Sequence, residues 1–158
     1  MQYGFGDWSG GSVPSRFEIP GVGHFVLSTS TSGDFSYFSC DYPRGDGGVA
    51  RILVYPEEGP FDGHYCQRVR EVTQYIVGNT VDLLAPTKRD IAEMLAAYEI
   101  PEPTSYDDLF RSLGLTYVKF LAGKRIEIIF EACPETGWFN LIGHLDEFLR
   151  MQRVQFDG

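Results

Sequence analysis

The chain has 158 residues, of which 43% are hydrophobic and 15% aromatic, a content typical of one folded domain rather than of a disordered segment. Thirteen Lys and Arg residues against 22 Asp and Glu residues give a net charge of −9, which argues against nucleic acid or an anionic membrane surface as a partner. The longest apolar runs, such as residues 52–55, are far shorter than the ~20 residues of a membrane-spanning helix.

The N-terminal third predicts an antiparallel meander. Residues 1–14 are rich in Gly and Ser without periodicity, so we expect a flexible arm there and one α+β domain over residues 15–158. After the arm, alternating or β-branched runs are separated by Gly, Pro and Asp turns. They predict strands over residues 16–19, 24–28, 34–40 and 49–55.

Helical spacing of apolar residues begins in the middle of the chain. Positions from Tyr65 to Ile76 follow an i, i+4, i+7, i+11 pattern, which predicts an amphipathic helix ending near residues 78–79. A second helix is predicted from Thr87, with a capping box to Asp90. A short third helix is predicted over residues 105–113, capped by a Ser at its start.

The last part of the chain returns to strand patterns, in which Ile126, Ile128 and Phe130 are expected on one face and Glu127 and Glu131 on the other. Residues 115–121 and 125–132 flank Gly123-Lys124, which predicts a hairpin, and two further strands are expected over residues 138–142 and 148–154. The order of strands, helices and strands predicts an α+β fold. We expect a mainly antiparallel sheet with about three helices from the middle of the chain packed on one face.

No motif in the chain specifies catalysis, a metal or a cofactor. The three histidines, His24, His64 and His144, each follow a glycine but lack metal-ligand spacing. The three cysteines are expected to be reduced thiols in the core. A Cys–His pair would require the fold to bring His24 or His144 to Cys66. We therefore expect no catalytic residues, no metal and no cofactor.

Acidic residues are concentrated between Glu57 and Asp108. This segment has eleven acidic and four basic residues, so it carries −7 of the net −9. A surface of this sign can steer a basic partner. The residues that we expect to contact such a partner lie at element ends and in loops. They are Glu57, Glu58, Asp62, Glu99 and Glu102.

The order of several segments resembles a known group of proteins. An apolar strand ends in Tyr55-Pro56-Glu57-Glu58, a helix follows over residues 69–77, and Ser105-Tyr106-Asp107-Asp108-Leu109 precedes a strand. A charged turn, Glu135-Thr136-Gly137-Trp138, then enters another strand. This pattern resembles small acidic bacterial proteins of uncharacterised function, some of them like immunity proteins. The resemblance implies a basic, toxin-like protein partner.

The sequence thus predicts a soluble, cytoplasmic, non-enzymatic protein-binding module that docks a basic partner. Two alternatives stay open. The first is a small-molecule-binding protein or hydrolytic enzyme with an aromatic-lined pocket, since the chain is rich in aromatic residues. The second is a structural or oligomerising module, which would expose a sheet edge or an apolar patch. The sequence leaves the oligomeric state open.

Overall fold

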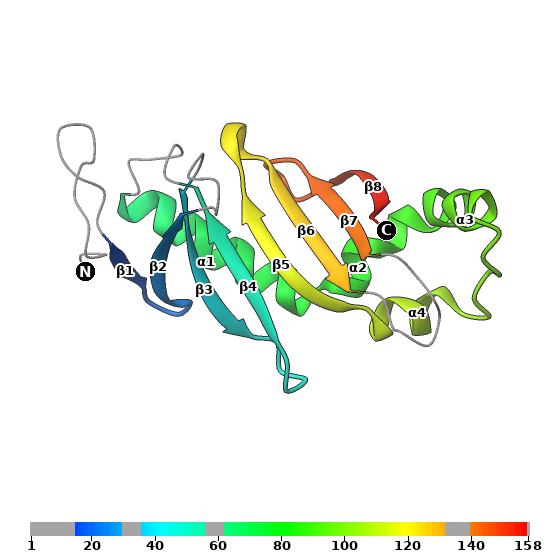
Figure 1. Cartoon of the computed structure of the whole chain (residues 1–158), viewed down its shortest axis with the longest axis horizontal. Coiled ribbons are helices and arrows are strands. Elements are labelled where there is room, and N and C mark those ends of the chain that lie inside the picture. The colour runs from blue at the N-terminus through cyan, green and yellow to red at the C-terminus, as the bar shows by residue number, and fades with distance from the viewer. Residues whose placement is uncertain (1–14, 30–35, 56–61, 132–139, 158) are drawn as a thin grey trace.

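The computed structural model describes residues 15–29, 36–55, 62–131 and 140–157, so the expected arm over residues 1–14 lies outside the described residues. Within these ranges the chain forms one sheet of eight strands and four α-helices (Figure 1), which confirms the predicted α+β class. The strands are β1 (Arg16–Ile19), β2 (Gly23–Thr29), β3 (Ser36–Pro43), β4 (Val49–Val54), β5 (Gly114–Phe120), β6 (Ile126–Glu131), β7 (Asn140–Leu145) and β8 (Met151–Asp157).

The strands follow one another across the sheet in chain order, from β1 to β8. All neighbouring pairs are antiparallel except β4 and β5, which run parallel with Ile52 opposite Val118. Two four-stranded meanders are therefore joined side by side at the middle of the sheet. A parallel pair requires a long crossover between its strands. All four α-helices of the described residues lie in this crossover.

The helices are α1 (Gly63–Gly78), α2 (Thr80–Leu84), α3 (Lys88–Ala97) and α4 (Tyr106–Ser112), with a short 3₁₀ turn, η2 (Ala85–Thr87), before α3. Figure 1 shows α1 and α2 behind the sheet and α3 beyond β8, at one end of the molecule. The amphipathic helix predicted from Tyr65 is confirmed as α1, which buries Cys66, Val69 and Ile76. The sequence analysis did not predict α2.

The short sequence patterns that predicted helix caps and turns were correct at some positions and wrong at one. The prediction of a capping box at Thr87 is wrong, because this side chain is buried and donates its hydroxyl to the carbonyl of Leu84 at 2.6 Å instead of capping α3. Ser105 does cap α4, accepting the backbone N–H of Asp108 at 3.2 Å. The predicted hairpin turn at Gly123-Lys124 is confirmed: both residues have positive φ and lie in the loop between Phe120 and Ile126, which Leu121 N–H closes on the carbonyl of Arg125 at 2.9 Å.

The sheet has one face covered by helices and one face that no described helix covers. In β6, Ile126, Ile128 and Phe130 are buried against the helices, as the alternation predicted. Phe17, Phe25 and Phe38 extend this core into the first meander, with the rings of Phe17 and Phe25 stacked at 5.0 Å. Each fully buried Phe contributes about 1.5–3 kcal/mol of apolar burial. The covered face therefore holds the core.

Candidate functional site

Residues 80–112 form a helical lobe at one end of the molecule, which we call the acidic lobe (Figure 1). Its elements α2, η2, α3 and α4 pack on one another, and α3 and η2 also contact β8. Leu84 of α2, Ile91 of α3 and Phe110 of α4 are fully buried and belong to the core on which these helices pack. The charged residues of the lobe consequently lie on its outer side.

The acidic lobe carries more negative charge than its own bases neutralise. It contains seven acidic and three basic residues, a formal charge of −4. Each base pairs with an acid of the lobe. The pairs are Lys88–Asp107 at 3.6 Å, Arg89–Glu93 at 3.5 Å and Arg111–Asp108 at 3.3 Å. Four carboxylates have no ion-pair partner among the described residues. They are Asp82, Asp90, Glu99 and Glu102.

Glu99 has an unfavourable position in the lobe. The chain leaves α3 through a left-handed residue, with Ile100 N–H bonded to the carbonyl of Leu95 at 2.9 Å and Glu99 N–H to that of Ala96 at 3.1 Å. Glu99 is the left-handed residue, at φ 56°, where glycine is favoured and another residue costs about 1–2 kcal/mol. Its carboxylate also faces the negative end of the helix dipole. Strain of this kind often accompanies function.

The structure separates the other expected contact residues. Glu102 is exposed in the lobe and accepts the hydroxyl of Tyr106 at 2.8 Å; desolvation and this carboxylate raise the pKa of Tyr106 to about 12. Asp62 lies at the start of α1 and caps it by accepting the N–H of Tyr65 at 2.8 Å. Glu57 and Glu58 fall outside the described residues. Glu99 and Glu102 therefore share one surface, and Asp62 belongs to another part of the molecule.

The histidines do not converge. His24 on β2 and His144 on β7 are five strand spacings apart in the sheet order, roughly 24 Å. His64 is exposed on α1, on the side of the sheet that carries the helices. In the part of the chain that the structure describes, no group of three or more His, Cys, Asp or Glu side chains is placed to hold a metal ion.

The two described cysteines are core thiols. Burial, with a contribution from the charge of Asp62, raises the pKa of Cys66 to about 12. Burial and Asp41 raise the pKa of Cys40 to about 11. Because the thiolate is the nucleophile, both groups are poorly nucleophilic at neutral pH. Cys66 is also fully buried while His64 is exposed, so these neighbours on α1 point to different sides. Cys133 lies outside the described residues.

The open face of the sheet carries a row of charged side chains. Glu127 on β6 lies between Lys119 on β5, at 3.6 Å, and His144 Nδ1 on β7, at 3.9 Å. His144 Nε2 is buried and has no hydrogen-bond partner among the described residues. Nucleophilic catalysis by a carboxylate–histidine pair needs a nucleophile hydrogen-bonded to that nitrogen. Among the described contacts, none supplies it.

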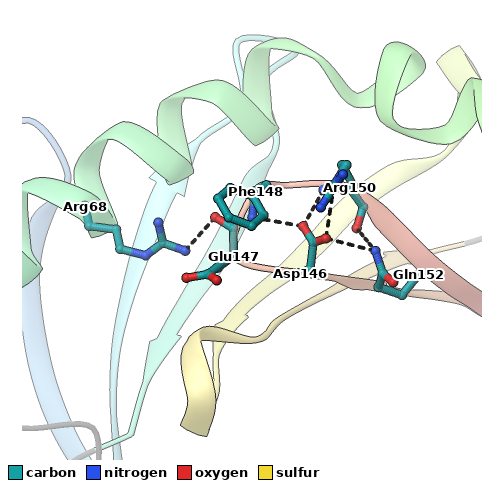
Figure 2. A network of polar contacts seen from close by, with 6 residues as sticks. All are labelled: Arg68, Asp146, Glu147, Phe148, Arg150 and Gln152. Atoms are coloured by element: carbon teal, nitrogen blue, oxygen red, sulfur yellow. Dashed lines mark hydrogen bonds and ion pairs between the residues drawn. The ribbon is translucent and has the colours of Figure 1, made fainter.

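A second feature is the turn between β7 and β8 (Figure 2), where the sequence analysis did not predict the hydrogen bonds that converge on Asp146. The Asp146 carboxylate accepts four hydrogen bonds, from the N–H groups of Phe148 and Arg150 at 2.9 and 3.0 Å, from Arg150 Nε at 3.2 Å and from Gln152 Nε2 at 3.0 Å. The backbone N–H of Arg150, that of Phe148 and the Arg150 guanidinium lower the pKa of Asp146.

This network fixes the conformation of the turn and its position relative to α1. Arg68 on α1 donates from Nη2 to the carbonyl of Glu147 at 3.2 Å, as Figure 2 shows. Leu149 adopts a left-handed conformation with φ 63°, which is rare for a bulky residue. Phe148 remains 68% exposed, with the Arg150 guanidinium 5.2 Å from its ring centre. A turn held in this way keeps the charged groups around it in defined positions.

Comparisons with other proteins identify no relative. No protein-family model matches the chain, and neither curated proteins nor solved structures give a significant match. None of the described helices combines the length and apolar character needed to cross a lipid bilayer. The candidate sites therefore depend on the chain's own geometry.

Proposed function

We propose that the protein is a non-enzymatic protein-binding module, immunity-like in role, whose acidic lobe docks a basic partner protein. The observation that carries the proposal is the group of four lobe carboxylates without an ion-pair partner among the described residues. Every base of the lobe is already paired, so a basic partner would meet a net negative surface. Such a surface raises the association rate and selects partners of opposite charge.

Glu99 adds independent support, because no described contact within the chain offsets the free energy that its backbone conformation costs on folding. A glycine at this position would end α3 with less strain, and a neutral side chain would suit the helix dipole better. A carboxylate held there, exposed at the end of a helix, is well placed to contact another molecule. The cytoplasmic location stays a prediction and is part of this proposal.

The test compares two variants of equal net charge. The lobe variant combines Asp90→Asn, Glu99→Gln and Glu102→Gln. The control variant combines Glu18→Gln, Glu71→Gln and Glu131→Gln, three exposed acids on β1, α1 and β6. Each variant raises the net charge by three. Wild type and both variants are immobilised, exposed to lysate of the source organism at low and high salt, and the captured proteins are identified by mass spectrometry.

We expect wild type and the control variant to capture the same basic protein at low salt and to release it at high salt. The lobe variant should capture much less of it, and surface plasmon resonance with the purified partner should show a slower association rate. Equal losses in both variants would mean that only total charge matters. Capture that is insensitive to salt, or no capture by wild type, would contradict the proposal.

A further inference from the structure

A cleft lies between the first turns of α1 and the β5–β6 hairpin, far from the acidic lobe along α1. We call it the α1 cleft; its volume is about 390 Å³, within the usual range for small-molecule sites. Its described lining consists of Asp62, His64, Tyr65, Arg68, Phe120, Leu121, Lys124, Arg125 and Ile126. α1 is 16 residues long, so about 24 Å separates its two ends.

The walls of the α1 cleft combine an apolar surface with cationic groups. Phe120 and Ile126 are core residues, at 4% and 1% exposure, and Leu121 is half-buried beside them. Arg68 comes from α1, while Lys124 and Arg125 come from the hairpin turn. Two separate elements thus contribute positive charge to one small space.

The charges in the α1 cleft are not internally balanced. The carboxylate of Asp62 accepts the N–H of Tyr65 as the cap of α1, and Lys124 Nζ pairs with Glu147 at 3.6 Å. Arg68 and Arg125 have no carboxylate partner among the described residues. Each is instead oriented by one carbonyl: Arg68 by that of Glu147 at 3.2 Å, and Arg125 by that of Ala122 at 3.0 Å. Both guanidinium groups retain free N–H donors for a ligand.

We infer that the α1 cleft binds a small organic anion, with a carboxylate or phosphate group at Arg68 and Arg125 and an apolar body against Phe120, Leu121 and Ile126. Guanidinium groups hold either oxyanion through paired hydrogen bonds. The apolar walls favour a compact hydrocarbon or aromatic body over a hydrated inorganic ion. This site is independent of the acidic lobe, and a ligand there does not require the proposed protein partner.

The test measures binding of four probes to the full chain by isothermal titration calorimetry. Phenylacetate and phenyl phosphate carry both an anion and an apolar ring, phenylethanol lacks the charge, and inorganic phosphate lacks the ring. The variants are Arg68→Gln, Arg125→Gln and Leu121→Ala, with Arg16→Gln on β1 as a control for loss of one positive charge elsewhere. Melting temperatures check that each variant is folded.

We expect phenylacetate, phenyl phosphate or both to bind wild type and the control variant at millimolar concentration or below. Arg68→Gln and Arg125→Gln should each raise Kd about 10- to 100-fold, the effect of losing a charge-assisted hydrogen bond. Leu121→Ala should weaken both aromatic anions while leaving inorganic phosphate unchanged. The inference is overturned if neither aromatic anion binds, if phenylethanol or inorganic phosphate binds as tightly as the aromatic anions, or if the arginine variants bind like the control.

Discussion

The acidic lobe and the α1 cleft differ in how they hold their charges. In the acidic lobe, helices pack on one another, three exposed ion pairs lie on the surface, and four exposed carboxylates have no ion-pair partner in the part of the chain that the structure describes. At the α1 cleft, a helix, a hairpin and a turn meet: Arg68 of α1 donates to the carbonyl of Glu147 in the turn, and Lys124 of the hairpin pairs with the Glu147 carboxylate. The cations there surround an apolar wall. A net charge of −9 thus conceals two surfaces suited to different partners, so net charge alone does not identify a ligand.

The largest expected effect comes from removing the aromatic anchor of the acidic lobe. Phe110 of α4 is fully buried, and Phe110→Ala should lower the free energy of unfolding by about 3–5 kcal/mol, since it deletes a ring and leaves a cavity. Phe148→Ala, in the turn beside the α1 cleft, removes a ring that is 68% exposed and should change stability by no more than about 0.5 kcal/mol.

Urea unfolding of both variants measures this difference. Similar losses in the two variants would mean that the turn beside the α1 cleft contributes to the core as much as the lobe helices do. A small loss for Phe110→Ala would mean that the lobe is not anchored through α4.

The features that the sequence predicted are those with short-range signals. The alternation over residues 126–131 predicted which face of β6 is buried, and the apolar spacing from Tyr65 predicted α1. The parallel pairing of β4 with β5 could not be predicted, because those strands are separated by all four helices. The pattern also ended two strands too early: the strand predicted over residues 34–40 continues to Pro43 as β3, and the one predicted over residues 138–142 continues to Leu145 as β7.

The candidate sites were predictable only in part. The concentration of acids in the middle of the chain pointed toward the lobe, and Glu99 and Glu102 were predicted from their positions at element ends. The role of Asp62 as a helix cap, and its distance from the lobe, depend on the direction of α1. The α1 cleft could not be predicted, because Arg68 and Arg125 are brought together only when the hairpin packs beside α1. The bonds that converge on Asp146 could not be predicted either, because they come from backbone and side-chain groups whose directions are set only in the folded turn.

An intermediate effect is expected from Asp146, and it depends on pH. Its pKa is lower in the folded protein than the ordinary value of about 3.9, so its bonds stabilise the fold above that pH and are lost as the pH falls through the folded-state pKa. Asp146→Asn should destabilise the protein at neutral pH and flatten the fall in stability below about pH 4. Urea midpoints measured from pH 7 to 2 test this.

Phe148→Ala is the matched control for the pH experiment, because it leaves the Asp146 carboxylate and its donors in place. Its stability should run parallel to that of wild type at every pH. If Asp146→Asn also runs parallel to wild type below about pH 4, the carboxylate does not hold the turn, and the positions of Arg68 and Glu147 at the α1 cleft must depend on other contacts.

The smallest expected change in stability is at Glu99, and it is the one that separates folding from function. Glu99→Gly should raise the free energy of unfolding by about 1 kcal/mol, because glycine adopts φ 56° without steric cost. Glu99→Ala keeps that cost and should gain only about 0.3 kcal/mol from removing a negative charge at the end of α3. Both variants should bind the basic partner more weakly. A variant that is more stable but binds the partner more weakly would show that the Glu99 carboxylate contributes to binding while it destabilises the fold. Unchanged binding would mean that the backbone strain at Glu99 has no role in binding the partner.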